Sequence, residues 1–337
     1  MQVISEGSVR VDLVGGTLDL EPINLILPHV VTLNVATSLK AKVELSSLPT
    51  QVIEIQSKDY AKNYEFHFEE LTEDNLYYNN YFKEMSFVLQ VLSLFKFEHG
   101  LKVVMSSGAP AGSGLGGSSA MGMTLFKAMC ELTGKSFSIQ ESVAQVKGVE
   151  GRILNQGIPG YQDYFPAMLG GVLALKGAAG RVDYEQLFSS DLKIFLEDHI
   201  TLVYSGISRN SGINNWDVYK KFFDGVPQTR QGLSEIAKIS HRTYQAIKEK
   251  NYEQILTLIG EEGEKRKSLA PNIVPNEVQF LFQNLKKDKL VKGLKMCGAG
   301  GGGCFILTHS AQTKAKLQEV LAEAKYKKLP FEIEKPL

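Results

Sequence analysis

Residues 110–120, Pro-Ala-Gly-Ser-Gly-Leu-Gly-Gly-Ser-Ser-Ala, are of types that could bind phosphate. Glycine lets the backbone adopt positive φ and come close to a ligand. An apolar, helix-forming run follows, so we expect a loop that enters a helix with Ser118 or Ser119 as its N-cap. Backbone N–H groups and the positive end of that helix would then point at the same anion. The segment predicts a site for the phosphates of a nucleotide.

A plain turn is the alternative for this segment, because glycine also marks ordinary loops. Its position between an expected strand and an expected buried helix favours the phosphate site. The chain has no Walker A loop, since no Gly-x4-Gly-Lys-Ser/Thr is present. In Gly134-Lys135-Ser136 the required upstream glycine is replaced by Met129, so we interpret that tripeptide as the C-terminus of a helix.

The composition argues against nucleic-acid and membrane partners. The 337 residues are 43% apolar, enough for two domains, and 37 basic residues balance 37 acidic ones. The three cysteines form no CxxC pair and the six histidines are scattered, so we expect a reducing cytoplasm and no histidine-built metal site. There is no basic leader and no run of about 18 apolar residues, so no membrane span is expected.

The first half of the chain has the pattern of a mixed α and β domain. Strands are expected at 9–14, 30–35, 40–45, 52–55, 64–68, 101–105 and 172–175. Helices are expected at 79–99, at 120–132 with Gly134 as its stop, and at 141–154. The polar stretch 176–191 is a candidate connection between two domains.

The second half mixes the same two kinds of element. Strands are expected at 200–204, 304–308 and 331–333, and helices near 230–249, 251–268, 275–287 and 311–325. A second glycine loop, at 298–303, precedes one of these strands. The alternation in both halves predicts an α+β chain with domains at residues 1–190 and 191–337.

The glycine-rich segment resembles the signature loop of the GHMP kinases, a superfamily of galacto-, homoserine, mevalonate and phosphomevalonate kinases. The residues that match are Pro110-x3-Gly114-Leu115-Gly116-x-Ser118-Ser119-Ala120. Residues 10–19, Arg-Val-Asp-Leu-Val-Gly-Gly-Thr-Leu-Asp, resemble the N-terminal substrate segment of that family, and residues 295–303 resemble its C-terminal glycine loop. Two further stretches are similar to segments of the bacterial D-glycero-D-manno-heptose 7-phosphate kinases and related sugar 1-kinases. They are Gln162-Asp163 followed by Gly170-Gly171, and residues 204–209.

The resemblance implies an N-terminal ribosomal-S5-like α+β domain and a C-terminal ferredoxin-like domain, with the substrates in the cleft between them. It also implies ATP and Mg²⁺ as cofactors and a small sugar or sugar phosphate as the other partner. The nucleotide-binding residues that it implies are Pro110, Gly112, Ser113, Gly114, Leu115, Gly116, Gly117, Ser118 and Ser119.

Asp163 matches the catalytic aspartate of the family, and a carboxylate can orient or receive the proton of an acceptor hydroxyl. The alternative is an N-cap for a short helix that starts at Tyr164. Arg10 would neutralise charge on the transferring phosphoryl group or lower the pKa of the acceptor, because arginine is permanently charged.

The resemblance places Mg²⁺, which prefers hard oxygen ligands, near two side chains. Ser118 matches the metal-side hydroxyl when counted from Gly116, whereas counting back from Ala120 favours Ser119. Glu150, thirteen residues before Asp163, best matches the acidic ligand. Without the resemblance it would be an ordinary exposed carboxylate.

Asp19 matches the residue that binds the sugar hydroxyls in the family, and Gly16 and Thr17 lie in the same segment. A carboxylate suits this role because it can accept hydrogen bonds from two hydroxyl groups. The galactokinase pattern Gly-Glu-His-Thr-Asp reads Gly-Gly-Thr-Leu-Asp at 15–19, which argues against galactose. An ion pair at a strand edge is the alternative for Arg10 and Asp19.

The second glycine loop would bring Gly300 and Gly301 close to the substrate, with a flexible hairpin as the alternative. Arg209 is a candidate for binding a phosphate at the far end of the sugar, and Lys176 and Arg181 are weaker candidates. A solvated surface arginine is the alternative for Arg209.

Together with these residues, the resemblance implies ATP-dependent phosphorylation of a small sugar at its anomeric hydroxyl, with a heptose 7-phosphate as the first candidate. The alternatives are another acceptor, such as galactose, fucose or a mevalonate-type alcohol, and a non-catalytic regulator that binds sugar and nucleotide. Asp163, Arg10 and Glu150 together argue against the regulator. The oligomeric state stays open.

Overall fold

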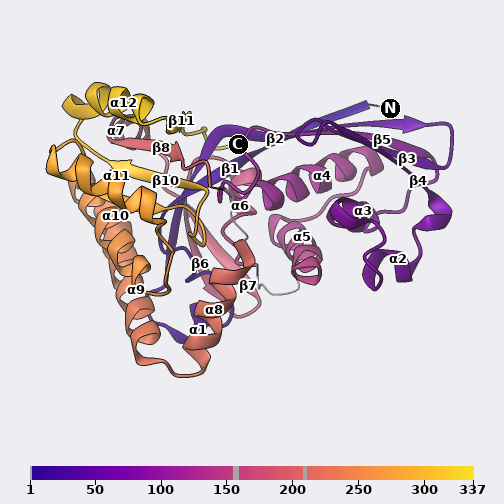
Figure 1. Cartoon of the computed structure of the whole chain (residues 1–337). Helices are drawn as coiled ribbons and strands as arrows, with labels where there is room; N and C mark the ends of the chain where they lie inside the picture. Colours follow the sequence, from indigo (N-terminus) through magenta and orange to yellow (C-terminus); the bar gives the residue numbers. More distant parts are fainter. Residues whose placement is uncertain (1, 155–158, 208–210) are drawn as a thin grey trace.

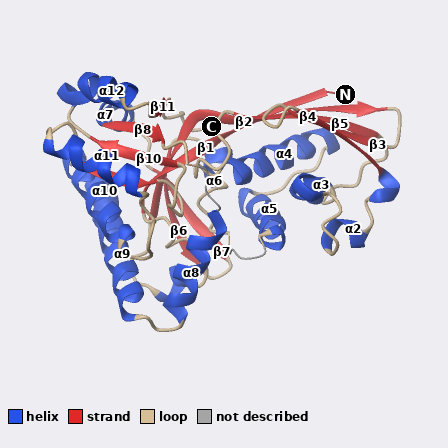
Figure 2. Cartoon of the chain, in the orientation of Figure 1, coloured by secondary structure: helices blue, strands red, loops and turns tan. Residues whose placement is uncertain are grey.

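The computed structural model describes residues 2–154, 159–207 and 211–337. Its strands form one sheet of seven strands and one of four. Figure 1 shows the large sheet running to the right above helices α2 to α5, and the small sheet at upper left among the C-terminal helices. Figure 2 shows that both halves combine helices and strands, so the expected α+β class is confirmed.

The large sheet is built around one long strand. Its members are β1 (Gln2–Val14), β2 (Thr32–Leu48), β3 (Val52–Ser57), β4 (Lys62–His67), β5 (Gly100–Ser107), β6 (Val172–Ala178) and β7 (Arg181–Gln186). The order is β4-β3-β5-β2-β6-β7, and β1 pairs with β2. That pairing shifts register just before Arg10 and just after Asp12, and such bulges re-aim the side chains beside them.

Helices pack beneath the large sheet. They are α1 (Ile23–Ile26), α2 (Glu73–Tyr77), α3 (Ser86–Leu92), α4 (Gly117–Thr133), α5 (Ile139–Ile153) and α6 (Phe165–Leu169), with short 3-10 turns at Phe68–Glu70 and Lys83–Met85. Helix α4 contacts β1 and β2 on one side and α3 and α5 on the other, which explains its apolar sequence. This packing fixes the N-terminus of α4 close to the residues that follow β5.

The small sheet is antiparallel and has the order β11-β8-β10-β9. Its strands are β8 (Ile200–Tyr204), β9 (Gly293–Met296), β10 (Cys304–Thr308) and β11 (Lys327–Leu329). Its helices are α7 (Ser190–His199), α8 (Ser211–Phe223), α9 (Pro227–Lys248), α10 (Tyr252–Lys267), α11 (Asn276–Lys287) and α12 (Lys314–Glu323), with a 3-10 turn at Ala311–Thr313. In β10, Phe305 and Leu307 join one hydrophobic cluster and Cys304 and Ile306 another, as a strand buried on both faces requires.

The two sheets share hydrophobic packing. One cluster joins residues of the large sheet, such as Val11 and Leu33, to Ile306 of the small sheet. The C-terminal residues 331–337 also return to the large sheet, where Ile333 bridges to Thr37. We propose the domain boundary at residues 190/191, where the chain passes from β7 to α7, with this tail crossing back.

Most of the expected elements are confirmed. The strands predicted at 101–105, 172–175, 200–204 and 304–308 and the helices predicted at 120–132, 141–154, 230–249, 251–268, 275–287 and 311–325 are present, with small differences in their bounds. Gly134 ends α4 with φ of 66°, the left-handed conformation that glycine adopts without strain. Within the described ranges, no helix is long and apolar enough to cross a membrane.

Two predictions in the first 100 residues were wrong. The strands expected at 30–35 and 40–45 are one continuous strand, β2, because its middle pairs with β1 instead of turning. The helix expected at 79–99 is reduced to Lys83–Met85 and Ser86–Leu92. Asn80, which precedes these turns, has φ of 51°, and a right-handed helix cannot include such a residue.

Three further predictions were wrong. Residues 176–191 are not a linker, because they form the end of β6, the whole of β7 and the start of α7. The last strand lies at Lys327–Leu329, and residues 331–333 contribute only the isolated bridge of Ile333. The N-cap of α4 is Gly116, with φ of 71°, and neither of the two serines. The sequence also gave no indication of α7, α8 and β9.

Candidate active site

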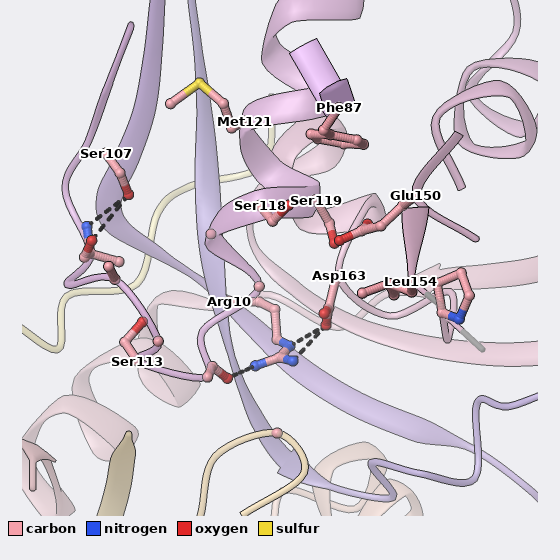
Figure 3. A pocket seen from close by; sticks show the side chains of 18 of the residues that line it. Arg10, Phe87, Ser107, Ser113, Ser118, Ser119, Met121, Glu150, Leu154 and Asp163 are labelled. Carbon is pink, nitrogen blue, oxygen red and sulfur yellow. Dashed lines mark hydrogen bonds and ion pairs between the residues drawn. The ribbon is translucent and has the colours of Figure 1, made fainter. Parts of the chain in front are cut away.

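A cavity of about 390 Å³ lies where the two halves of the chain meet, within the size range of ligand sites. Its walls come from the loop before α4, the turn after β1, helix α5 and the residues before α6. Gly298 and Ala299 of the second half also line it. Figure 3 shows that Arg10, Asp163, Ser119 and Glu150 converge beside the start of α4.

The loop before α4 lines the cavity with backbone. Gly112, Gly114 and Gly116 have φ of 67°, 79° and 71°, so all three use a conformation that favours glycine. Gly117 and Ser118 also line the cavity and begin α4, whose first N–H groups have no acceptor within the helix. This end of the cavity can therefore bind an anion.

Not every residue predicted in this loop faces the cavity. Pro110, Gly112, Ser113, Gly114, Gly116, Gly117, Ser118 and Ser119 line it. Leu115 is fully buried beneath the loop, and its carbonyl accepts a hydrogen bond of 3.0 Å from the backbone N–H of Arg10. Leu115 thus attaches the loop to β1, and it does not line the cavity.

Arg10 joins the loop to Asp163. Its Nε donates to Oδ1 of Asp163 at 2.7 Å, and its Nη1 donates to the carbonyl of Gly114 at 2.6 Å. The Arg10 side chain is buried, whereas that of Asp163 is 29% exposed and reaches the cavity. The dashed lines in Figure 3 mark these contacts. The two residues predicted to be catalytic are therefore in direct contact.

Glu150 lies on α5 and accepts hydrogen bonds of 2.7 Å from both Ser119 Oγ and the hydroxyl of Tyr164. Burial raises the pKa of this carboxyl above its usual value, against the effect of hydrogen bonds from Tyr164, from Ser119 and, to a smaller extent, from Ser118. Ser119 is buried beside it, whereas Ser118 is exposed. The described residues include no cluster of three or more His, Cys, Asp or Glu side chains that could hold a metal.

These oxygens nevertheless fit Mg²⁺, which takes few protein ligands when it is bound with a nucleotide. The half-buried Glu150 carboxylate and a hydroxyl at hydrogen-bond distance from it form a suitable oxygen pair. The geometry favours Ser119 over Ser118 as the partner of Glu150.

Asp19 lies at the other end of the cavity and is 2% exposed. Its Oδ2 accepts a hydrogen bond of 3.1 Å from the backbone N–H of Gln162, and its Oδ1 accepts one of 3.3 Å from Gln162 Nε2. Burial, followed by the charge of Asp163, raises the pKa of Asp19 to about 6. A Cβ on Gly160 would lie 1.8 Å from Oδ2, so this carboxylate requires glycine there.

An apolar region completes the cavity beyond the glycine loop. It is lined by Tyr60, Met85, Phe87, Val88, Met105 and Met121. Asp59 lies at its edge and accepts a hydrogen bond of 2.9 Å from the N–H of Ser107. No sequence motif distinguishes these residues, which come from separate elements.

The remaining predicted residues are more scattered. Thr17 lines the cavity, but Gly16 lies behind it, where its carbonyl accepts a hydrogen bond from Arg266. Gly300 and Gly301 pack against Ile273 and do not line the cavity.

The candidates for a phosphate on the sugar have different positions. Arg209 lies outside the described residues. Lys176 stands over the ring of Tyr244, 4.1 Å from its centroid, and Arg181 forms an exposed pair with Asp183. Neither of these two cations lines the cavity.

Sequence reasoning assigned no role to several polar residues in and below the cavity, namely Asp12, Tyr164, Glu262, Arg266 and Lys295. Asp12 and Lys295 were within segments that resemble family motifs, which was the available signal. Glu262 and Arg266 lie in a helix of ordinary charged sequence, so no local pattern distinguishes them.

Comparison with known proteins identifies the N-terminal part of the chain. Residues 80–171 match the family model for the GHMP kinases N-terminal domain. The L-fucokinase/L-fucose-1-P guanylyltransferase of Bacteroides fragilis is 26% identical over 253 residues, which are 72% of this chain and 26% of that protein. The chain thus spans about a quarter of the length of this curated relative.

Solved structures resemble the chain over its whole length. The mevalonate kinase of Methanococcus jannaschii has a TM-score of 0.77 and 20% identity, with 99% of each chain covered. The D-glycero-D-manno-heptose 1-phosphate kinase of Bacteroides thetaiotaomicron has a TM-score of 0.75 and 19% identity, with 99% of this chain and 97% of that chain covered. Residues 80–171 therefore match the GHMP kinases N-terminal domain, and the chain as a whole shares its fold with these solved kinases.

Proposed function

We propose that the chain is an ATP-dependent kinase that phosphorylates a hydroxyl group of a small sugar. The observation that carries this proposal is the contact between the glycine loop and Asp163. A Cβ on Gly116 would lie 3.1 Å from Cγ of Asp163, so the N-terminus of a helix and a carboxylate border the same space. A phosphate donor and a hydroxyl acceptor need these two groups side by side.

The loop residues would hold the phosphates of the nucleotide through backbone N–H groups and the N-terminus of α4. Arg10, between the loop and Asp163, would balance the charge that develops on the transferring group. Asp163 would orient the acceptor hydroxyl and receive its proton. Ser119 and Glu150 would hold Mg²⁺, which, when bound, neutralises charge on the β- and γ-phosphates.

The apolar region of the cavity would hold the base of the nucleotide. Phe87, Met105 and Met121 present flat or flexible apolar surface there. Tyr60 and Asp59 belong to the segment that follows β3, close to the start of the glycine loop. This arrangement leaves the opposite end, with Asp19 and Gln162, for the acceptor.

For the acceptor we propose a sugar with a free anomeric hydroxyl. A heptose 7-phosphate is one candidate, supported by the sequence resemblance of Gln162-Asp163 and Gly170-Gly171, and it would need a cation such as Arg209. An unphosphorylated sugar such as fucose is the second candidate. It is supported by the named fucokinase relative and because Arg10, already paired with Asp163, is the one cation among the described residues that line the cavity.

A coupled assay of ADP release tests the proposal. The chain is incubated with Mg²⁺, ATP and a panel of free sugars, phosphorylated sugars and mevalonate, and the product is examined by ³¹P NMR for an anomeric phosphate. We expect sugar-dependent ADP release with at least one member of the panel. Binding of ATP and sugar without turnover would favour a regulator, and turnover of mevalonate alone would exclude the sugar.

A further inference from the structure

Four charged side chains lie buried beneath the acceptor end of the cavity. They are Asp12 of β1, Glu262 and Arg266 of α10, and Lys295 of β9, and each is at most 2% exposed. Lys295 Nζ lies 2.7 Å from Asp12 Oδ2 and 3.9 Å from Glu262 Oε2. Arg266 Nη2 donates to Glu262 Oε1 at 2.6 Å. The two acids and two bases balance, and none of them lines the cavity.

Arg266 forms hydrogen bonds with the turn that follows β1. Its Nη2 donates to the carbonyl of Gly16 at 2.6 Å, and its Nη1 donates to Oγ1 of Thr17 at 2.9 Å. Glu262 accepts a hydrogen bond of 3.3 Å from the N–H of Gly15. The turn that carries Asp19 is therefore fixed from below by a helix that lies about 250 residues later in the chain.

The turn needs such support because of Thr17. Its φ is 68°, a left-handed conformation that is strained for a β-branched residue. Strain of this kind costs about 1–3 kcal/mol and persists only where the surroundings impose it. Thr17 lines the cavity, and Asp19 follows two residues later.

The other half of the cluster supports the second wall. Asp12 accepts a hydrogen bond of 3.3 Å from the N–H of Gly298, which lines the cavity. Although burial alone would raise it, the charges of Lys295, Arg10 and Arg266 hold the pKa of Asp12 below its usual value. The cluster thus connects the turn after β1 to the loop after β9.

Stability alone is a weak explanation for such a cluster, because buried ion pairs can often be replaced by apolar residues at little cost. We propose that Arg266 is a positioning residue that holds residues 15–19 in the conformation that binds the acceptor. It acts through Thr17 and Gly16 and touches neither substrate. This inference rests on the proposed sugar-kinase activity.

The test compares Arg266→Lys with wild type. Lysine keeps the charge but carries its donors on one nitrogen, so it cannot span the acceptors on Gly16, Thr17 and Glu262 as the planar guanidinium does. We expect KM for the sugar to rise about tenfold, while KM for ATP changes by less than about twofold. Lys265→Ala is the matched control, because Lys265 lies on the same helix in an exposed pair with Glu235 and should leave both constants unchanged.

A double-mutant cycle with Thr17→Gly separates positioning from general destabilisation. Glycine adopts the left-handed conformation without strain, so the turn should depend less on Arg266. We expect Arg266→Lys to raise the sugar KM by less than about threefold in the Thr17→Gly background. An equal effect in both backgrounds would overturn the proposal, as would equal rises in both KM values.

Binding gives a readout independent of turnover, and it also covers a variant that folds poorly. Trp216, the single tryptophan of the chain, follows cavity-lining Asn215, so its fluorescence can report sugar binding. Thr17→Val, which keeps the strained β-branched side chain but removes the hydroxyl that Arg266 contacts, should weaken sugar binding and leave ATP binding unchanged, and unchanged sugar binding would count against the inference. If wild type phosphorylates no sugar, the proposed function fails; if it does and these shifts are absent, only the role of Arg266 fails.

Discussion

The two glycine-rich loops have similar compositions but different surroundings. In the loop before α4, Gly116 has φ of 71° and lies against Asp163, which also lines the cavity. In the loop before β10, a Cβ on Gly300 would lie 2.7 Å from the carbonyl oxygen of Ile273, and one on Gly303 would lie 2.5 Å from that of Ser113. The first loop approaches a space for ligands, whereas the second mainly approaches other parts of the protein.

The comparison teaches that glycine content signals a close approach of the backbone without identifying what is approached. The second loop still contributes Gly298 and Ala299 to the cavity. The N–H of Cys304, at its end, also donates to the carbonyl of Ser113 at 2.6 Å, so the second loop braces the first. Substitutions in the two loops should therefore fail in different ways.

The largest effect is expected for the carboxylate that faces the first loop. Asp163→Asn keeps the shape but removes the proton acceptor, so kcat should fall by about 10²–10⁴. Binding of ATP, measured by calorimetry, should persist. Asp183→Asn, in an exposed pair with Arg181, is the control and should behave as wild type. Wild-type turnover by Asp163→Asn would remove this residue from the mechanism.

Gly116→Ala should come next. Alanine is strained at φ of 71°, and its Cβ would press on Asp163 at 3.1 Å, so kcat/KM for ATP should fall by about 10². Gly134→Ala is a matched control, because Gly134 has φ of 66° and nothing within 4 Å of a built Cβ. It should cost about 1 kcal/mol of unfolding free energy and leave the kinetics intact. If Gly116→Ala and Gly134→Ala lost the same amount of kcat/KM, backbone strain alone would explain both losses.

The two serines at the start of α4 separate the candidates for the metal ligand. Since Ser119 contacts Glu150, Ser119→Ala should raise the Mg²⁺ concentration needed for half-maximal activity about tenfold. Ser118→Ala, at an exposed position, should change it by less than about threefold. A reversed order in a Mg²⁺ titration would assign the role to Ser118.

The pH dependence of acceptor binding should report Asp19. Its pKa of about 6 lies above its ordinary value, so the carboxylate is ionised above pH 6 and protonated below it. The protonated form accepts hydrogen bonds poorly, so KM for the sugar should be about tenfold higher at pH 5 than at pH 7. The Asp19→Asn variant should have a higher KM for the sugar, and this KM should not change with pH over this range. A wild-type KM that is flat between these pH values would contradict this assignment.

The smallest effect on activity is expected in the second loop. Gly300→Ala combines φ of 78° with a contact of 2.7 Å to backbone, so it should lower the unfolding free energy by about 2 kcal/mol. Below the melting temperature, kcat and both KM values should stay within about twofold of wild type. A selective rise in the sugar KM without loss of Tm would restore Gly300 as a substrate-binding residue.

The sequence predicted the chemical groups better than their arrangement. The first loop was identifiable because its residues are consecutive and lead directly into α4. Ser118 and Ser119 could not be separated, because their directions depend on where α4 begins, and that is set by the left-handed Gly116. The role of Arg266 could not be predicted for a different reason, since its partner Thr17 lies about 250 positions away in the chain.

Hydrogen–deuterium exchange with and without a non-hydrolysable ATP analogue and Mg²⁺ tests the central claim most directly. We expect amides in peptides covering 112–119 to become protected on nucleotide binding, and those of 300–303 to change little. Protection confined to the second loop, or bound nucleotide with neither loop protected, would contradict the assignment of the phosphate site to the start of α4.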